Sequence, residues 1–185
     1  MRVPLCEDGA ASSPSFYLSV RSPRRAARTT YDLVVPLEIR HAQPADYGRV
    51  IGRVNAWWGG RDMAPMLPKL FFVHFEGTSF VVDDDEGQLA GFLIGFLSQA
   101  DDEEAYIHFV GVDPARRGAG VARALYERFF AAVAPRTIVR AVTSPVNERS
   151  VAFHRALGFE VERVDEDYDG RGEARVLLVK RLPPV

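Results

Sequence analysis

A strand, a glycine-rich turn and a helix follow one another in the middle of the chain, and together they could bind an anion. The strand-like run 106–112 ends before Pro114, and an amphipathic helix begins a few residues later. The first N–H groups of a helix have no partner within it, and glycine lets a ligand approach the main chain closely. Arg116, Arg117 and Arg123 add positive charge that suits phosphate oxygens. This arrangement is typical of a phosphate-binding site.

Two common phosphate-binding motifs do not fit this loop. The P-loop ends in Gly-Lys-Ser/Thr, and this loop has neither the lysine nor the hydroxyl. The dinucleotide-binding fingerprint needs a third glycine and an acid on the next strand, whereas the next strand-like run, 137–143, carries no acid. The loop alone leaves open a simpler interpretation, in which it is a turn with a solvated pair of arginines.

A second segment, 147–159, has the start and stop signals of a helix. Asn147 is a favourable N-cap, Glu148 suits the first turn, and Gly158 is placed to end the helix before a strand. The segment therefore predicts a helix over residues 147–157.

Both segments resemble motifs of the GNAT superfamily of acyl-CoA-dependent N-acyltransferases. The spacing Arg117-x-x-Gly120-x-Ala122 after a strand resembles its motif A. The run Asn147-Glu-Arg-Ser-Val-Ala-Phe-His-Arg-Ala-Leu-Gly-Phe159 resembles its motif B. The resemblance covers about residues 104–164.

The resemblance implies an α/β (α+β) fold with a central, mixed and mostly antiparallel sheet flanked by helices. It also implies that the sheet splays between the strand ending at Val112 and the strand 137–143. Residues 1–36 are rich in Ala, Ser, Arg and Pro and are expected to be a disordered extension before a domain at 37–185. The hydrophobic pattern predicts strands at 37–41, 79–83, 88–97, 106–112, 137–143, 159–164 and 175–180, and helices at 44–57, 69–75, 118–134 and 147–157.

Composition excludes several classes of protein. The formal charge of −2 over 185 residues gives no general argument for a nucleic-acid partner or an acidic membrane. A single cysteine, Cys6, rules out a disulfide framework and a cysteine-rich metal site. No run is long enough to span a membrane and the start lacks a secretory signal, so a cytoplasmic location is expected.

The resemblance implies acetyl-CoA as the acyl donor, with no metal. The diphosphate would rest on backbone N–H groups of the loop, and the pantetheine arm would pair like an extra strand with the strand ending at Val112. The cofactor-binding residues that it implies are Val110, Val112, Arg117, Gly118, Ala119, Gly120, Val121, Ala122, Arg123 and Asn147.

His108 is the first candidate for a general base. Tyr106, His108, Val110 and Val112 are expected to share one face of their strand because side chains alternate. A neutral imidazole is suited to taking a proton near pH 7, and some arylalkylamine-type GNAT enzymes carry histidine here. The alternative is a partly buried histidine bonded to a neighbour. Glu104 is the second candidate, acting through water.

His154 is the candidate for a general acid. It stands where many family members have a tyrosine that protonates the departing thiolate. Asn147 and His154 are seven residues apart, two helical turns, so both could face the cofactor. The alternatives are that His154 only packs the helix or hydrogen-bonds near the sulfur, and that Asn147 is only an N-cap.

An irregular aromatic segment follows the first expected helix and is expected to recognise the acceptor. The substrate-binding candidates are Trp57, Trp58, Arg61, Phe72 and Tyr106, although core packing is the commoner fate of such aromatic residues. The acidic runs 83–85 and 101–104 are interpreted as solvated turns.

These features favour an N-acetyltransferase that moves an acetyl group from acetyl-CoA directly to a primary amine of a small molecule or peptide. Two alternatives stay open: a non-catalytic acyl-CoA sensor, and a protein-interaction domain whose arginine loop contacts a partner. The sequence leaves the oligomeric state open, a homodimer included.

Overall fold

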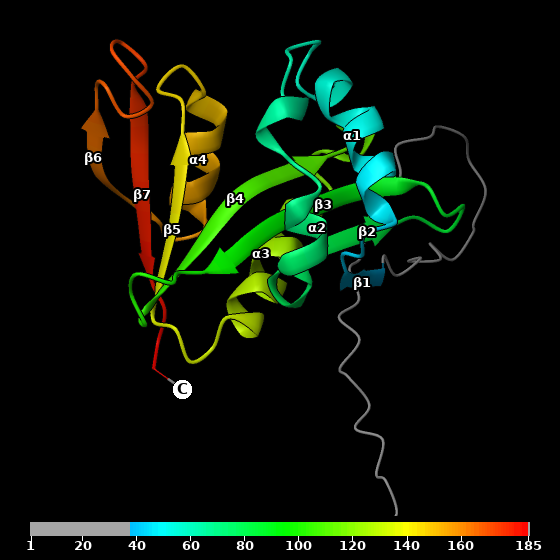
Figure 1. Ribbon diagram of the computed structural model, residues 1–185, viewed down its shortest axis with the longest axis horizontal. Coiled ribbons are helices and arrows are strands. Elements are labelled where there is room, and N and C mark those ends of the chain that lie inside the picture. Colours follow the sequence, from blue (N-terminus) through cyan, green and yellow to red (C-terminus); the bar gives the residue numbers. More distant parts are fainter. Residues whose placement is uncertain (1–37, 185) are drawn as a thin grey trace, which may run out of the picture.

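Seven strands form one sheet with helices on both faces (Figure 1). The computed structural model describes residues 38–184. The strands are β1 (Glu38–His41), β2 (Phe80–Asp83), β3 (Leu89–Leu97), β4 (Glu104–Val112), β5 (Ile138–Thr143), β6 (Glu160–Asp165) and β7 (Arg175–Arg181). The helices are α1 (Asp46–Trp57), α2 (Leu70–His74), α3 (Val121–Ala132) and α4 (Glu148–Ala156), with short 3₁₀ turns η1 (Ala64–Met66), η2 (Glu76–Thr78) and η3 (Pro114–Arg116).

The sheet is mixed and mostly antiparallel, as predicted. Its strand order is β1-β2-β3-β4-β5-β7-β6, and only β4 and β5 pair in parallel. The chain crosses from β4 to β5 through α3, as a parallel pair requires.

Two hydrophobic cores cover the two faces of the sheet. One packs α3 residues such as Leu125 and Phe129 against β3, β4, β5 and β7. The other packs α1 residues such as Val50 and Val54, together with Phe72 of α2, against β2 and β3. The loop before α3 and the segment between α1 and α2 are therefore anchored on opposite faces, with β4 between them.

The order of the elements agrees with the sequence-based expectation, and only the boundaries differ. The strand expected at 106–112 begins at Glu104, which pairs with Ile138 of β5. The helix expected at 118–134 is shorter, because Gly118 and Gly120 have positive φ angles and remain in the loop. The predicted extension at 1–36 and Cys6 lie outside the described residues.

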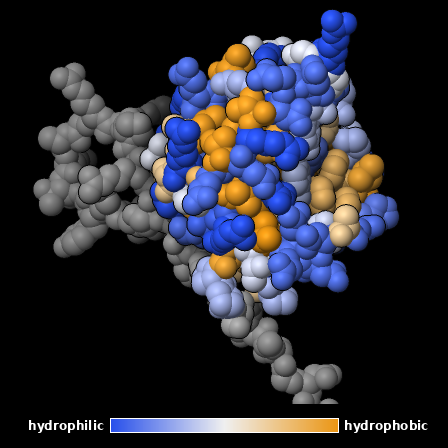
Figure 2. All heavy atoms as spheres, turned by 90° about the vertical axis from the view of Figure 1, so that its left-hand side faces the viewer, coloured by the Kyte–Doolittle hydropathy of each residue, from blue (hydrophilic) through white to orange (hydrophobic). Residues whose placement is uncertain are grey.

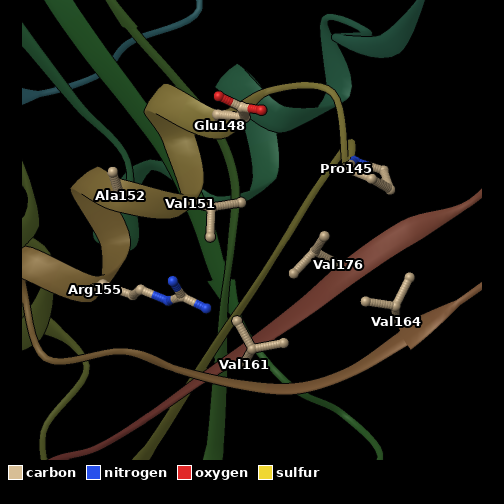
Figure 3. Close-up of a pocket in the computed structure, with 8 residues that line it drawn as sticks. All are labelled: Pro145, Glu148, Val151, Ala152, Arg155, Val161, Val164 and Val176. Carbon is tan, nitrogen blue, oxygen red and sulfur yellow. The ribbon is translucent and has the colours of Figure 1, made fainter.

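An apolar groove lies at the β6 edge of the molecule. Figure 2 views this edge and shows apolar side chains gathered in a band across it. The groove has a volume of about 320 Å³ and is lined by Pro145, Glu148, Val151, Ala152, Arg155, Val161, Val164 and Val176 (Figure 3). None of the residues predicted to form the site lines it. No helix among residues 38–184 is both long enough and apolar enough to cross a membrane.

Candidate active site

β4 and β5 separate part-way along their length. The parallel pairing runs only from Glu104–Ile138 to Ile107–Ala141, so the last five residues of β4, 108–112, have no partner on β5. Figure 1 shows the two strands diverging beyond this point. The splay implied by the resemblance is therefore present, and it leaves the edge of β4 that faces β5 open to an extended ligand.

The loop from η3 to α3 presents backbone donors at the open end of this splay. Among the described residues, no partner accepts a hydrogen bond from the backbone N–H groups of Arg117, Gly118, Gly120, Val121, Ala122 or Arg123. The N–H of Ala119 makes only a long bond of 3.4 Å to the Arg116 carbonyl. Gly118 and Gly120 are exposed, so an anion can reach these donors. This is the geometry that a diphosphate needs.

The three arginines near the loop differ in their availability. Arg116 is paired with Asp84 of the turn between β2 and β3. Arg117 donates from Nη2 to the Trp57 carbonyl at 2.6 Å and from Nε to the Val112 carbonyl at 3.3 Å. Arg123 is exposed on the first turn of α3 and has no side-chain partner among the described residues. Arg116 and Arg117 thus already donate to protein groups, whereas the guanidinium of Arg123 has no partner among the described residues, and the cofactor roles of Arg117 and Arg123 stay predictions.

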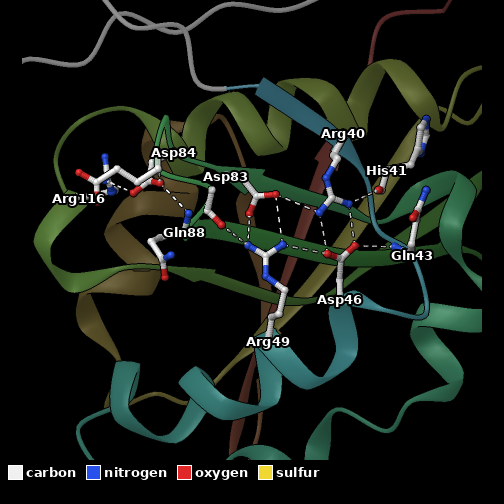
Figure 4. Close-up of polar contacts among 11 residues, drawn as sticks. Arg40, His41, Gln43, Asp46, Arg49, Asp83, Asp84, Gln88 and Arg116 are labelled. Atoms are coloured by element: carbon white, nitrogen blue, oxygen red, sulfur yellow. Dashed lines mark hydrogen bonds and ion pairs between the residues drawn. The ribbon is translucent and has the colours of Figure 1, made fainter.

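The acidic run 83–85 is not a simple solvated turn. Asp83 accepts from Arg49 of α1 at 2.6 Å and from Arg40 of β1 at 3.0 Å (Figure 4). Arg40 also donates to Asp46 at 2.7 Å. Burial alone would raise the pKa of Asp46, but hydrogen bonds from Arg40 and a backbone N–H outweigh it, so the pKa is lowered. Asp83 therefore ties α1 and β1 to the end of β2.

A β-bulge at His108 changes which side chains share a face of β4. The register of the β3–β4 pairing shifts at this residue: Ile94 pairs with Phe109, whereas the next residue, Gly95, pairs with Ile107. Ile107 packs in the core on the α3 side, whereas Phe109 packs in the core on the α1 side.

The prediction that Tyr106, His108, Val110 and Val112 share one face is therefore wrong. Val110 and Val112 pack against the α3 side. His108 stacks on Phe71, on the other face of the sheet. Sequence alternation could not reveal this, because the bulge inserts one residue into the pattern.

One ring nitrogen of His108 is hydrogen-bonded to the protein, and the other has no hydrogen-bond partner among the described residues. Its Nε2 lies 2.8 Å from the Met66 carbonyl oxygen, which can only accept, so Nε2 carries the hydrogen. The lone pair is then on Nδ1. Burial lowers the pKa of His108, opposed in part by the Met66 contact, so the ring is neutral at pH 7. Its ring stacks on Phe71 with centroids 4.4 Å apart, which fixes its orientation.

Glu104 is placed less favourably for a base. It lies at the start of β4, within the paired part of the strands, and its Oε1 accepts from Nε of Arg140 at 2.6 Å. Arg140 also bonds Glu162 of β6 at 2.7 Å. The structure therefore places Glu104 in an ion-pair network that ties β4 to β5 and β6.

Both ring nitrogens of His154 are engaged within the protein. Nδ1 lies 2.8 Å from the Ser150 carbonyl oxygen, and Nε2 lies 2.8 Å from the Tyr126 hydroxyl. The carbonyl can only accept, so Nδ1 carries the hydrogen and Tyr126 donates to Nε2. The residue is 6% exposed, and burial lowers its pKa, opposed by the Ser150 bond. This geometry favours the packing alternative over the expected acid role, since both ring nitrogens are already hydrogen-bonded to protein groups.

We expect Tyr126→Phe to lower the free energy of unfolding by about 1–3 kcal/mol, because it leaves Nε2 of His154 buried without a donor. Urea denaturation at pH 7.5 measures this change. Tyr47→Phe is the control: the Tyr47 hydroxyl has no partner among the described residues, and its ring keeps the edge contact with Phe72. Equal, small effects of the two substitutions would show that the buried hydrogen bond does not stabilise the fold.

Asn147 is the N-cap of α4, as predicted. Its side-chain oxygen accepts from the Ser150 N–H at 3.3 Å. The amide NH₂ group makes no hydrogen bond within residues 38–184, so a cofactor contact remains compatible with capping. The cap explains the residue without a ligand, and its cofactor role stays a prediction.

Two of the predicted acceptor residues are part of the core. Trp57 is 6% exposed and stacks on Phe92, and Phe72 is 0% exposed. Neither side chain can contact an acceptor where it lies, which corrects that expectation. Trp58 is half-buried against Phe92 and Phe109, and Arg61 is exposed beside it.

Tyr106 meets a residue that the sequence analysis missed. Burial raises the pKa of Tyr106, and the neighbouring Tyr168 and Asp169 add to the effect. Tyr168 lies on the loop between β6 and β7, whose acidic residues are Glu166, Asp167, Asp169 and Glu173. The sequence does show Tyr168 as a tyrosine within an acidic, glycine-containing loop. It does not show that Tyr168 lies near Tyr106, which is 62 residues away on β4.

Comparisons with known proteins agree with this geometry. A match to the acetyltransferase (GNAT) family spans residues 41–159. The chain belongs to the GNAT family. The matched region contains both motifs, β4, α3 and α4.

Individual relatives in this family are distant. The chain is 34% identical over 85 residues to an L-2,4-diaminobutyric acid acetyltransferase of Nocardia farcinica, covering 45% of this chain and 44% of that protein. It is 24% identical over 123 residues to an N-terminal acetyltransferase complex ARD1 subunit homolog of Dictyostelium discoideum, covering 63% of this chain and 61% of that protein. The chain thus spans about half the length of these curated relatives.

Among solved structures, the diaminobutyrate acetyltransferase EctA of Paenibacillus lautus, determined with L-2,4-diaminobutyric acid and coenzyme A, resembles this chain with a TM-score of 0.62. The identity is 20%, and the alignment covers 78% of this chain and 95% of the other. This likeness shows that the two proteins share a fold.

Proposed function

We propose that this protein transfers an acetyl group from acetyl-CoA to a primary amine of a small molecule or a peptide. The observation that carries the proposal is the row of backbone N–H groups at residues 117–123, six of which have no partner among the described residues, beside the splay of β4 and β5. These donors fit a diphosphate, and the open edge of β4 fits an extended arm. Acetyl-CoA supplies both groups together with an activated thioester.

The residues beside β4 supply the remaining chemistry. An alkyl amine has a pKa of about 10, so it must lose a proton before it attacks the thioester carbonyl. Nδ1 of His108 is the proposed acceptor of that proton. A bond then forms between the amine nitrogen and the carbonyl carbon, and the carbon–sulfur bond breaks to release the thiolate. A thiol has a pKa of about 8.5, so its anion leaves more readily than an amine, even without a dedicated acid.

The acceptor is proposed to enter between η1–α2 and the β6–β7 loop. His108 stacks on Phe71 of α2, and Tyr168 of the β6–β7 loop is near enough to Tyr106 to raise its pKa. The acidic residues of the β6–β7 loop favour a cationic amine over an anionic acceptor.

The direct test measures thiol release from acetyl-CoA against a panel of amines that includes L-2,4-diaminobutyrate and a peptide with a free N-terminus. Thiol release and N-acetyl product with at least one acceptor supports the proposal. Binding of acetyl-CoA without thiol release for any acceptor favours the sensor. Absence of binding favours the protein-interaction domain.

A further inference from the structure

The side chain of Arg117 joins the cofactor loop to the end of α1. Its Nη2 donates to the carbonyl of Trp57, the last residue of α1, at 2.6 Å. Its Nε donates to the carbonyl of Val112, the last residue of β4, at 3.3 Å. A single guanidinium, carried by the loop proposed to bind the diphosphate, therefore spans the ends of two elements that are far apart in sequence.

This contact supplies what the end of α1 lacks. The last carbonyl groups of a helix have no partner within it and carry partial negative charge. The last turn of α1 has no basic residue of its own. Arg117 brings a cation to this end from another element, and two of its N–H groups are held by the carbonyls of Trp57 and Val112.

Residues 58–67 follow α1. They begin next to the Trp57 carbonyl that Arg117 holds, and near their other end the Met66 carbonyl contacts His108. Asn55 Oδ1 accepts from the N–H groups of Met63 at 2.8 Å and Ala64 at 3.0 Å, which holds the middle of the segment. The Met66 carbonyl near its other end accepts from Nε2 of His108 at 2.8 Å. Residues 58–67 therefore orient His108, the proposed base. Trp58, their first residue, directly follows Trp57, whose carbonyl Arg117 holds.

The same segment also contacts β4 directly. Trp58 lies over Gly111, where a Cβ would come within 2.9 Å of the indole Cη2 and 2.4 Å of Phe92 Cε1. Gly111 lies between Val110 and Val112, which the family resemblance assigns to cofactor binding. A displacement of the end of α1 would thus change the packing at the end of β4 and the position of His108.

We propose that Arg117 is a positioning residue. Its side chain sets the place of residues 58–67 and hence of His108, and it couples occupancy of the cofactor loop to the acceptor side of the site. Its backbone N–H remains with the anion-binding donors. The coupling rests on the proposed function, because it needs a ligand in the loop.

The chain carries its own reporter of this junction. Its two tryptophans, Trp57 and Trp58, are adjacent and lie where Arg117 meets α1. Acetyl-CoA binding should change their fluorescence. Hydrogen exchange of residues 58–67 in the free protein reports the same junction without any ligand.

In Arg117→Ala we expect acetyl-CoA affinity to stay within about threefold of wild type, because the backbone N–H groups remain. We expect the tryptophan response at saturation to fall by half or more and exchange in residues 58–67 to rise at least tenfold. With an active acceptor, its KM should rise about tenfold. Arg117→Lys keeps the charge but can satisfy only one carbonyl well, so intermediate values are expected.

Variants of two other arginines serve as controls, because they remove a positive charge without removing the Arg117 contacts. Arg123→Ala removes the free guanidinium at α3 and should weaken acetyl-CoA affinity about tenfold, with the saturated tryptophan response unchanged. Arg53→Ala removes an exposed arginine of α1 that has no partner among the described residues, and should change neither quantity.

The proposal is overturned if Arg117→Ala weakens acetyl-CoA binding as Arg123→Ala does while residues 58–67 keep wild-type exchange. It is also overturned if exchange, the tryptophan response and acceptor KM all match wild type. If wild-type protein binds no acetyl-CoA, the proposed function and the coupling both fail. Exchange in the free protein then still decides whether Arg117 positions residues 58–67.

Discussion

Gly120→Glu should raise the dissociation constant for acetyl-CoA at least a hundredfold, a loss of about 2.7 kcal/mol of binding free energy. Gly120 precedes α3 with φ 87° and ψ −3°, a left-handed conformation that glycine adopts without strain. Glutamate there would strain the turn and place a negative charge among the N–H groups proposed to hold the diphosphate. Isothermal titration calorimetry with acetyl-CoA measures the change.

Gly120→Ala is the control for the charge. It carries the same backbone strain, about 1–2 kcal/mol, but leaves the donors open and uncharged. Its affinity for acetyl-CoA should stay within about tenfold of wild type. If Gly120→Glu folds and binds acetyl-CoA as tightly as wild type, the diphosphate does not rest on this loop and the proposed function fails.

His108→Ala should lower kcat by about 10²–10⁴ below pH 8, the range that general-base catalysis contributes. The loss should shrink toward pH 10, where the amine acceptor deprotonates unaided. Burial lowers the pKa of His108 from its ordinary value, so the wild-type rate should decline at a lower pH than an unperturbed histidine would give, as the pH falls through that lowered pKa. Steady-state rates from pH 5.5 to 10 provide the measurement.

His108→Gln separates a base from a positioning group. The glutamine amide can still donate to the Met66 carbonyl, so residues 58–67 keep their anchor, but it cannot accept a proton at the place of Nδ1. We expect this variant to be as impaired as His108→Ala at pH 7. Near wild-type activity in His108→Gln, together with a pH-independent loss in His108→Ala, would assign His108 to positioning alone.

Local signals in the sequence predicted the elements and much of the cofactor side. Gly118 and Gly120 keep the backbone out of the helix, and Asn147 caps α4 through its own side chain. Such features act over a few residues, because they depend on φ angles and on hydrogen bonds to nearby backbone groups. The loop, α3, α4 and the family could therefore be inferred before any tertiary contact was known.

Only the tertiary structure decided which side chains are available for chemistry. The partner of Arg117 is 60 residues away in α1, and that of His154 is Tyr126 on another helix. Trp57 is buried by the packing of α1 on β3, and the bulge at His108 comes from the register with β3. A residue type states what a side chain can donate or accept. Whether another group already satisfies it depends on contacts between distant parts of the chain, which local patterns do not encode.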